Sequence, residues 1–140
     1  MAPAPAGPPK CVFCEIVAGR APAYRVYEDE ETLAFLDLYP FTRGHLLVIP
    51  KRHGARLTEF GAADQAAVVR TLEKMCRRAE RLTSDYNVAL NAGAKAGQIV
   101  FHLHFHLIPR YGESNPFHPP ARVRLTDEEA QRVAAELSVP

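Results

Sequence analysis

Phe101-His102-Leu103-His104-Phe105-His106-Leu107-Ile108-Pro109-Arg110 is the stretch that decides the fold of this chain of 140 residues. Three of the chain's six histidines stand in it at every second position, and Phe or Leu fills each gap. A period of two is the pattern of a β-strand with two different faces. We expect the Phe and Leu side chains to face a core and the imidazoles to face the opposite side, roughly 6.6 Å apart along the strand.

The spacing of these histidines limits what they do together. The first and third are expected to lie roughly 13 Å apart, so all three reach a single metal ion only with difficulty. The row is therefore expected to serve more than one metal centre. A partly exposed imidazole of near-neutral pKa is suited to nucleophilic or acid–base chemistry. A lone histidine on a strand is usually a half-buried polar group, but three in register against an apolar face indicate function.

Length and composition indicate one globular domain with no strong affinity for nucleic acid or membrane. The chain is long enough for one core, and its net charge of +1 gives no basic excess of the kind that binds nucleic acid. Residues 1–10 are rich in Pro and Ala and lack a hydrophobic run, so we expect a disordered tail rather than a signal peptide. No apolar stretch approaches the length of a membrane span.

These features predict a cytoplasmic protein whose three cysteines are reduced. Cys11 and Cys14 are then metal ligands or a redox pair rather than a structural disulfide. Their spacing is that of a zinc half-site. A thioredoxin-like redox pair is the alternative, but that motif opens a helix after a strand, and no strand is expected before Cys11.

Strands are predicted at 25–28 and 32–38, joined as a hairpin, and at 45–49, whose continuous apolar run indicates a central strand. A further strand at 85–91 is separated from the histidine strand by a Gly-bearing loop, which favours an antiparallel pair. A helical turn is expected from Cys11 to a terminus at Gly19, and another at 57–60.

One long helix is predicted over residues 62–82. Its apolar stripe recurs at helical spacing and consists of Val68, Leu72, Met75, Cys76, Ala79 and Leu82. Thr126 and Glu129 form a capping box that opens a C-terminal helix over about 126–137. One antiparallel sheet with one long helix and smaller helices is an α+β domain.

The sequence blocks together identify the chain as a member of the histidine-triad (HIT) family, and it resembles the Hint-type bacterial branch. The resemblance extends from Cys11 to about Tyr111. The blocks that support it are Cys11-x-x-Cys14-x-Ile16, Val26-Tyr27-Glu28-Asp29, Leu33-Ala34-Phe35-Leu36-Asp37, Gly44-His45-x-Leu47-Val48-Ile49-Pro50-Lys51, Asn91-x-Gly93-x-x-Ala96-Gly97-Gln98 and His102-Leu103-His104-Phe105-His106-Leu107.

The resemblance implies a HIT-like α+β fold with an antiparallel sheet of about five strands. With the length of the chain it predicts a single HIT domain over residues 11–140, although no motif covers the segment after Gly112. It implies a nucleotide-binding hydrolase that acts at the α-phosphate of a nucleoside monophosphate derivative. The expected ligand is a purine nucleotide such as AMP or GMP or a derivative of it. The resemblance further implies a homodimer in which two sheets join.

Carried over residue by residue, the resemblance makes His104 the nucleophile that forms a nucleotidyl-histidine intermediate. A backbone carbonyl is expected to fix its tautomer. His106 is expected to donate to the phosphate or the leaving group. Asn91 resembles a side-chain donor to the phosphate. His45 corresponds to an additional histidine beside the site, although a satisfied histidine at a strand end remains an alternative.

The resemblance also implies a nucleotide pocket with an apolar wall and one polar anchor. Asp37 resembles the carboxylate that accepts hydrogen bonds from the ribose hydroxyls. Many family members have Ser or Thr where this chain has Ile99, so only a backbone contact carries over there. The base-contacting positions are Phe13, Ile16, Phe35 and Leu38, and the phosphate is expected to meet the backbone N–H groups of Gly97, Gln98 and Ile99.

Hint-type bacterial proteins with this cysteine pair commonly complete a structural zinc site with two histidines. The matching positions here are His53 and His102, which join Cys11 and Cys14. A closed Cys₂His₂ tetrahedron leaves no position for water and is therefore structural. The triad would then be divided between a metal and the chemistry.

Three other functions stay open at this point. A dinucleoside polyphosphate hydrolase resembles the fragile-histidine-triad branch, which has Gln in place of the third histidine, whereas His106 is intact here. A nucleotidyltransferase would pass the nucleotide to an acceptor other than water. A non-catalytic nucleotide-binding or scaffold protein belongs to another class, and steady-state turnover of an adenosine phosphoramidate would separate it from the enzymes.

Overall fold

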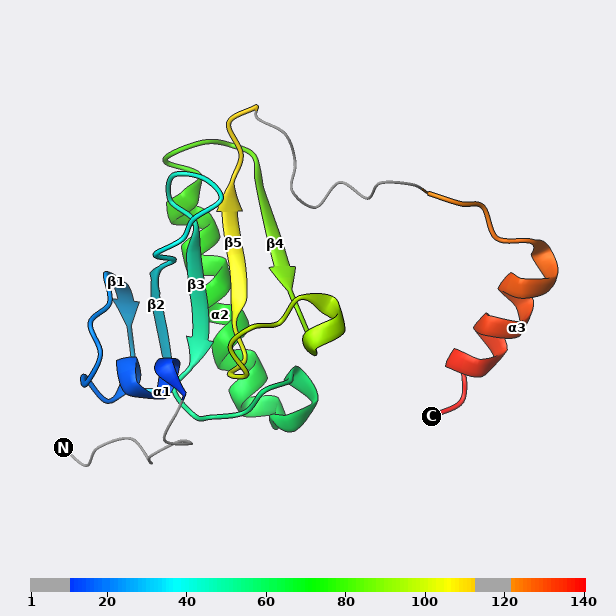
Figure 1. The fold of residues 1–140 in the computed structure, drawn as a ribbon, viewed down its shortest axis with the longest axis horizontal. Coiled ribbons are helices and arrows are strands. Elements are labelled where there is room, and N and C mark those ends of the chain that lie inside the picture. Colours follow the sequence, from blue (N-terminus) through cyan, green and yellow to red (C-terminus); the bar gives the residue numbers. More distant parts are fainter. Residues whose placement is uncertain (1–10, 113–121) are drawn as a thin grey trace.

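Five strands form one antiparallel sheet at the centre of the computed structural model (Figure 1). The structure describes residues 11–112 and 122–140. The strands lie in the order β1-β2-β3-β5-β4, and every neighbouring pair is antiparallel. The expected α+β class, the first hairpin and the pairing of the histidine strand with the strand before it are confirmed. The strands are β1 (Arg25–Glu28), β2 (Thr32–Leu36), β3 (Leu46–Pro50), β4 (Tyr86–Leu90) and β5 (Phe105–Pro109).

The two strands β2 and β3 are buried on both faces, as the apolar run at 45–49 predicts. Alternate residues of these strands pack into two different clusters because successive side chains of a strand point to opposite faces. One cluster joins the sheet to α1 (Val12–Val17) and contains Phe13, Ile16, Leu33, Phe35, Leu47 and Ile49. The other lies under α2 (Ala62–Ala79) and contains Ala34, Leu46, Val48, Val68, Met75 and Leu107.

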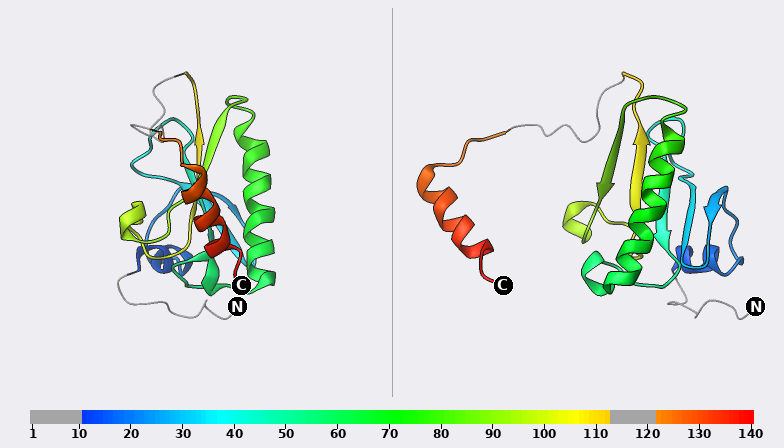
Figure 2. Two further views of the ribbon diagram at one scale, coloured as in Figure 1. Left: turned by 90° about the vertical axis from the view of Figure 1, so that its right-hand side faces the viewer. Right: turned by 180° about the vertical axis from the view of Figure 1, so that it is seen from behind.

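The long helix α2 covers one face of the sheet (Figure 2). Its apolar stripe is largely as predicted, with Val68, Met75 and Ala79 buried. The predicted end was wrong, because α2 ends at Ala79 and Leu82 lies beyond it, 39% exposed. Thr71 is a buried member that hydropathy did not select, and its hydroxyl is 2.6 Å from that of Thr32 on β2.

The shorter helices lie where the sequence placed helical turns. α1 begins after Cys11 and its chain reverses at Gly19, whose φ of 79° is a conformation that glycine adopts without steric cost. The turn predicted at 57–60 is the 3-10 helix η1 (Leu57–Glu59). A second 3-10 helix, η2 (Ala94–Ala96), lies in the loop between β4 and β5.

The histidine stretch is a strand only in its second half, which corrects the sequence expectation. β5 begins at Phe105 and pairs with β3 and β4 from there to Pro109. The residues before β5 do not pair with a strand. The Leu103 N–H instead donates to the carbonyl of Gly54, in the loop that follows β3, at 2.7 Å. Phe101 is 49% exposed and does not face the core, whereas Leu103 and Leu107 do.

The C-terminal helix α3 (Asp127–Leu137) has the predicted N-cap, because the Thr126 hydroxyl accepts from the Glu129 N–H at 3.2 Å. It stands apart from the sheet in Figure 1, and none of its residues is buried. That residues 11–140 form a single domain stays a prediction. The tail predicted at residues 1–10 lies outside the described residues. Within the described residues, no helix combines the length and the apolar character needed to cross a bilayer.

Candidate functional site

Most of the predicted site residues meet in one cavity of about 470 Å³ on the face of the sheet opposite α2. β5 supplies His106, and His104 comes from the segment just before it. The loop after β2 supplies Asp37, and the loop after β4 supplies Asn91. The cavity is lined by eleven of the predicted residues, which are Phe13, Ile16, Phe35, Asp37, Leu38, His45, Asn91, Gly97, Ile99, His104 and His106.

The ring of His104 is held by its own backbone. Its Nδ1 lies 2.7 Å from the carbonyl oxygen of His102, and a carbonyl can only accept, so the Nδ1 atom bears the proton. The lone pair is therefore on Nε2. Phe13 packs edge-on against this ring at 5.1 Å between centroids. Burial lowers the pKa of His104, and the bond to the His102 carbonyl partly opposes that shift. The ring is consequently neutral at pH 7, with an available lone pair.

The protonation of His106 is set by a chain of hydrogen bonds that starts at the backbone of Phe41. The Phe41 N–H donates to Nδ1 of His45 at 3.1 Å, so the single proton of a neutral His45 is on Nε2. That Nε2 lies 3.0 Å from Nδ1 of His106, which must accept. The proton of a neutral His106 is therefore on Nε2. His106 is thus available as a donor through Nε2, while His104 offers a lone pair.

Burial keeps this group of histidines neutral. It lowers the pKa of His106 to about 4, with further contributions from the nearby His104 and His45. Burial also lowers the pKa of His45, although the carboxylate of Asp37 opposes the shift. The ring of Phe41 stacks on that of His45 with an interplanar angle of 9°. The alternative for His45 was a buried histidine whose hydrogen bonds serve only its own ring. Its Nε2 instead contacts Nδ1 of His106 and fixes the tautomer of that second histidine.

Asp37 follows β2, which ends at Leu36 rather than at the predicted position 38. The chain turns here because the Tyr39 N–H donates to Oδ1 of Asp37 at 2.9 Å. The other oxygen, Oδ2, lies 3.5 Å from Nε2 of His45. An ionised carboxylate has about four lone-pair sites. Asp37 therefore keeps acceptor capacity for a ligand while it also orients His45.

The loop between β4 and β5 presents fewer free backbone donors than the sequence predicts. The Gly97 N–H already donates to the Ala94 carbonyl at 3.0 Å, and the Gln98 N–H to the Gly93 carbonyl at 3.1 Å. The Ile99 N–H has no partner within the described residues. Gly97 has a φ of 94°, which explains glycine at this position. Gln98 does not line the cavity, so its expected ligand contact remains a prediction.

The apolar wall of the cavity forms where the sequence placed the base-contacting residues. Phe13 and Phe35 lie edge to face at 5.4 Å, and both belong to the cluster beneath α1. Leu38 is 61% exposed at the cavity mouth. Sequence reasoning missed eight further lining residues, whose contribution depends on loop geometry rather than on any pattern. They are Val12, Pro22, Ala23, Leu36, Tyr39, Phe41, Leu47 and Val100.

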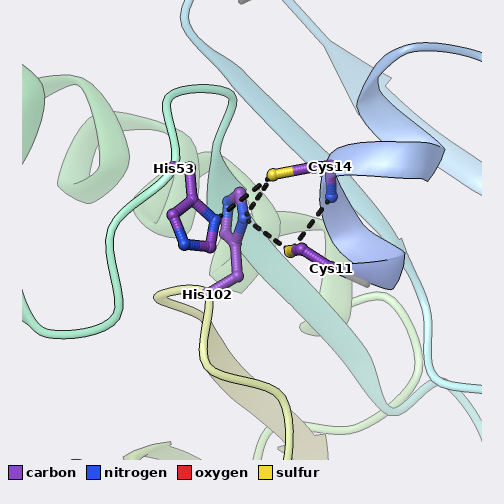
Figure 3. Close-up of side chains that lie close together, drawn as sticks. All are labelled: Cys11, Cys14, His53 and His102. Atoms are coloured by element: carbon purple, nitrogen blue, oxygen red, sulfur yellow. Dashed lines mark hydrogen bonds between the residues drawn. The ribbon is translucent and has the colours of Figure 1, made fainter. Parts of the chain in front are cut away.

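Beside the cavity, two cysteines and two histidines converge on one point (Figure 3). The ligand atoms of Cys11, Cys14, His53 and His102 all lie within 4.8 Å of one another. Sγ of Cys14 is 3.2 Å from Nδ1 of His53, and Nδ1 of His102 is 3.5 Å from both sulfurs. Zinc bonded tetrahedrally to sulfur and nitrogen requires ligand separations of about 3.5 Å. The four side chains therefore fit a tetrahedral metal ion.

The surroundings of this cluster prepare it for a metal. Nε2 of His102 donates to the Pro50 carbonyl at 2.8 Å, which leaves the lone pair of Nδ1 directed to the cluster. The Cys14 N–H donates to Sγ of Cys11 at 3.4 Å, a contact that stabilises a thiolate. Burial lowers the pKa of His102 to about 4, so its ring is neutral, as a metal ligand must be.

A second group of potential ligands, Asp37, His45 and His106, also lies within 4.8 Å. It does not fit a metal in this arrangement. Nδ1 of His45 accepts from the Phe41 N–H, so a metal on Nε2 would require the ring to lose its last proton. The same contacts are satisfied by the hydrogen-bond chain from Phe41 to His106, which needs no ion.

Comparison with known protein families gives one clear match. The HIT domain family matches residues 18–113 of the chain. The protein called Protein hit from Bacillus subtilis is 46% identical over 109 residues, which are 76% of this chain and 75% of that protein. The adenosine 5'-monophosphoramidase HNT1 from Candida albicans is 40% identical over 110 residues, which are 74% of this chain and 72% of that protein.

Solved structures agree with these matches. A member of the HIT family of proteins from Bacillus subtilis is 39% identical and superposes with a TM-score of 0.83, covering 92% of this chain and 95% of that one. A zinc-bound histidine triad family protein from Mycobacterium smegmatis is 41% identical with a TM-score of 0.66, covering 92% of this chain and 94% of that one.

The low pKa values predict how stability depends on pH. His102 and His106 have pKa values of about 4 in the folded chain, against about 6.5 when unfolded. Between these values the unfolded chain binds protons that the folded chain does not. The free energy of unfolding should therefore fall as pH decreases from 7 to 5, by up to about 1.4 kcal/mol per pH unit for each histidine.

Urea unfolding of the metal-free protein at several pH values measures this dependence. Replacement of His106 by Gln removes one of the histidines whose pKa burial lowers, so the slope between pH 7 and 5 should become shallower. Carboxylates stay ionised in this interval and do not obscure the result. A stability that is constant from pH 7 to 5 would show that these histidines are not kept neutral by burial.

Proposed function

The chain belongs to the HIT domain family, and on this premise we propose that it is a nucleotide-binding hydrolase that acts on phosphoramidate or related derivatives of purine nucleoside monophosphates. The observation that supports this most directly is the bond from Nδ1–H of His104 to the His102 carbonyl, which leaves a nucleophilic Nε2 on a residue that lines the cavity. The name of the Candida albicans relative, an adenosine 5'-monophosphoramidase, supports the substrate class.

In the first step of the proposed reaction, Nε2 of His104 attacks the α-phosphorus. A nitrogen–phosphorus bond forms, and the bond from phosphorus to the leaving group breaks with its electron pair on the leaving nitrogen, which takes up a proton from solvent and departs as a neutral amine. His104 keeps its Nδ1 proton throughout, so the nucleotidyl-histidine carries a positive charge on the ring. The His102 carbonyl, 2.7 Å away, stabilises that charge.

In the second step, water attacks the same phosphorus and the nitrogen–phosphorus bond breaks. The electron pair returns to Nε2, and the ring leaves as neutral imidazole because Nδ1 never lost its proton. Water loses one proton to solvent, and the nucleoside monophosphate is released. A charged ring is a far better leaving group than a neutral one, so the backbone bond of His104 assists both steps.

Neutral donors would bind the phosphate oxygens during these steps. Nε2–H of His106 is one donor, since the chain from Phe41 through His45 fixes its tautomer. The Asn91 amide and the Ile99 N–H, both on residues that line the cavity, are the others. The phosphate contacts predicted for Gly97 and Gln98 would require their N–H groups to be shared with the Ala94 and Gly93 carbonyls.

The nucleoside would lie with its base against the apolar wall and its ribose at Asp37. Phe13, Ile16, Phe35 and Leu38 offer the apolar surface that a purine needs. Asp37 has acceptor sites beyond those used by Tyr39 and His45. AMP and GMP share the ribose and phosphate that this arrangement recognises.

The charges of the cavity favour this substrate class over dinucleoside polyphosphates. No Lys or Arg is among the described residues that line the cavity, and Asp37 adds a negative charge. A polyphosphate leaving group carries several negative charges and would be poorly stabilised there. Transfer of the nucleotide to an acceptor other than water would use the same first step. A purely scaffolding role leaves the fixed tautomers of His104 and His106 without a purpose.

We further propose that Cys11, Cys14, His53 and His102 bind a structural zinc ion. The distances between their ligand atoms fit a tetrahedron, and the zinc-bound relative from Mycobacterium smegmatis supports the choice of metal. With four protein ligands, no coordination position remains for water. The ion would tie α1 to the segment that precedes β5 and would hold His102, whose carbonyl orients His104.

The roles of neighbouring triad residues can be separated by substitution. His104→Ala should lower turnover of an adenosine phosphoramidate by about four or more powers of ten, because no other group forms the intermediate. It should leave zinc bound. His102→Ala and Cys11→Ser should both reduce zinc content and the melting temperature, since metal binding is coupled to folding. They should lower turnover only in part.

Metal analysis, thermal melting and turnover of each variant test these assignments. His102→Ala retains the backbone carbonyl that orients His104, so it is a matched control for the catalytic substitution. Loss of metal in His104→Ala with retention in His102→Ala would contradict the division and indicate a catalytic metal. A wild-type protein that turns over no nucleotide derivative would refute the proposed activity.

Asp37→Ala tests the ribose contact. The variant should bind AMP roughly ten- to 150-fold more weakly, since hydrogen bonds to a carboxylate contribute roughly 1.5–3 kcal/mol. Calorimetry with AMP and with its 2',3'-dideoxy analogue separates two explanations. The substitution should leave the affinity for the analogue, which lacks the hydroxyls, nearly unchanged. An equal loss for both ligands would mean that Asp37 acts on the loop and His45 rather than on ribose.

We also propose a homodimer that forms through the edge strand β4 and through α2. β4 is the last strand of the sheet order, and Val88 on it is 45% exposed. Light scattering at micromolar concentration should give twice the mass of the chain, and Val88→Lys should shift the protein towards monomer. Val12→Lys is a control of equal exposure away from β4. A monomeric wild type would contradict the proposal.

A further inference from the structure

Gln98 is a buried polar side chain that the proposed chemistry does not use. It is 4% exposed, yet it is not among the residues that line the cavity. A buried side-chain amide is costly unless its donors and acceptor are satisfied. The Gln98 side chain is therefore placed to hold backbone segments together rather than to bind a ligand.

Three hydrogen bonds connect Gln98 to three separate points of the backbone. Its Oε1 accepts from the Gly93 N–H at 2.8 Å. Its Nε2 donates to the Ala55 carbonyl at 3.0 Å and to the Val100 carbonyl at 3.1 Å. The bond to Gly93 lies within the loop between β4 and β5. The bond to Ala55 connects this loop to the segment after β3, and the bond to Val100 connects it to the residues that precede the histidines.

The loop that Gln98 spans has little conformational preference of its own. Gly93 and Gly97 have φ values of 91° and 94°, and glycine is the residue with the greatest backbone freedom. The two ends of this loop, Asn91 and Ile99, are the proposed phosphate donors. Their separation and orientation depend on a segment that its own sequence does not make rigid.

The Ala55 anchor belongs to a firmly held part of the chain. Two residues earlier is His53, one of the four side chains of the proposed metal cluster. The Gly54 carbonyl between them accepts from the Leu103 N–H at 2.7 Å. The segment 53–55 is thus hydrogen-bonded to the histidine stretch, and Gln98 links the loop between β4 and β5 to this same segment.

We propose that Gln98 is a positioning residue, which fixes the loop 91–99 relative to His104 so that Asn91 and the Ile99 N–H meet the phosphate. This inference rests on the proposed nucleotide-binding function. This role requires no contact between the Gln98 side chain and a ligand, since that residue is not among those that line the cavity. Its loss should therefore weaken recognition of the phosphate without altering recognition of the nucleoside, and without loosening the metal cluster.

The test compares wild type with Gln98→Met and Gln98→Glu. Met has a similar length and forms none of the three hydrogen bonds. Glu retains an acceptor for the Gly93 N–H but directs a carboxylate oxygen at the Ala55 and Val100 carbonyls. Both variants should bind AMP roughly five- to tenfold more weakly, and should bind adenosine as wild type does. With a phosphoramidate substrate, kcat should fall with the AMP affinity, while zinc content is unchanged.

Gln65→Met is the control for the loss of side-chain amide hydrogen bonds at a half-buried glutamine. Nε2 of Gln65 donates to the Leu57 and Phe60 carbonyls at 3.1 and 3.0 Å, away from the loop. This variant should lose stability comparably and retain full affinity for AMP. Unchanged AMP affinity in both Gln98 variants would overturn the inference, as would an equal loss for AMP and adenosine. Wild type that binds neither ligand would instead refute the proposed function.

Amide hydrogen exchange provides a measurement that needs no variant. Gly93 lies in a loop, but its N–H is bonded to Gln98, so it should exchange much more slowly than a free amide. The neighbouring Lys95 N–H, which has no partner within the described residues, gives the reference rate in the same loop. Equal rates for Gly93 and Lys95 would show that Gln98 does not hold the loop in solution and would overturn the inference.

Discussion

The hydrogen bond from the His104 ring to the carbonyl of His102 is the constraint on which the rest of the site depends. It exists because the histidine stretch is not a strand over its whole length. In a regular strand the His102 carbonyl would face a neighbouring strand and bond to its N–H. β5 begins only at Phe105, so this carbonyl is outside the ladder and accepts from a side chain. Irregular backbone before the strand is thus what orients the His104 ring, the proposed nucleophile.

Fixed hydrogen-bond partners also set the tautomers of three further rings, a backbone group for His102 and His45 and the His45 ring for His106. The Pro50 carbonyl accepts from Nε2–H of His102 and leaves the lone pair of Nδ1 directed to the cysteine and histidine cluster. The Phe41 N–H donates to Nδ1 of His45, and Nε2–H of His45 in turn donates to Nδ1 of His106, which leaves the proton of His106 on Nε2. The three histidines at alternate positions therefore differ in their free ring nitrogen because each meets a different fixed partner, which is the Pro50 carbonyl, the His102 carbonyl or the His45 ring. Burial supports the scheme, since it lowers the pKa values and keeps the rings neutral.

The sequence predicts those parts of the molecule that repeat with a period. Alternation in the histidine stretch predicts the strand β5, and the apolar run of β3 predicts a strand buried on both faces. The apolar stripe of α2 predicts the long helix. The pattern does not show where regular structure stops. Phe101 continues the alternation but is exposed, since the Leu103 N–H bonds to Gly54 and draws the segment out of the sheet. Leu82 continues the helical stripe but lies beyond the helix.

Contacts between a side chain and a distant backbone group leave no pattern at all. Gln98 resembles any polar loop residue until its three partners are known. The acceptor role of Pro50 and the donor role of Phe41 depend on chain direction at points far away in the sequence. Motif resemblance selected eleven residues that line one cavity, because the family's blocks encode these contacts jointly. It could not indicate which N–H groups of the loop between β4 and β5 already donate to carbonyls within that loop.

The charge of the cavity affects both the binding of the substrate and the release of the product in the proposed reaction. Asp37 is the one carboxylate, and no Lys or Arg is present, among the described residues that line it. A nucleoside phosphoramidate bears one negative charge at phosphorus, whereas the monophosphate product bears nearly two at pH 7, since its second pKa is about 6. Neutral donors bind both without full compensation, and Asp37 repels the product more strongly than the substrate. A Lys or Arg in this cavity would strengthen binding of the product most, so its absence assists release of the monophosphate after the second step.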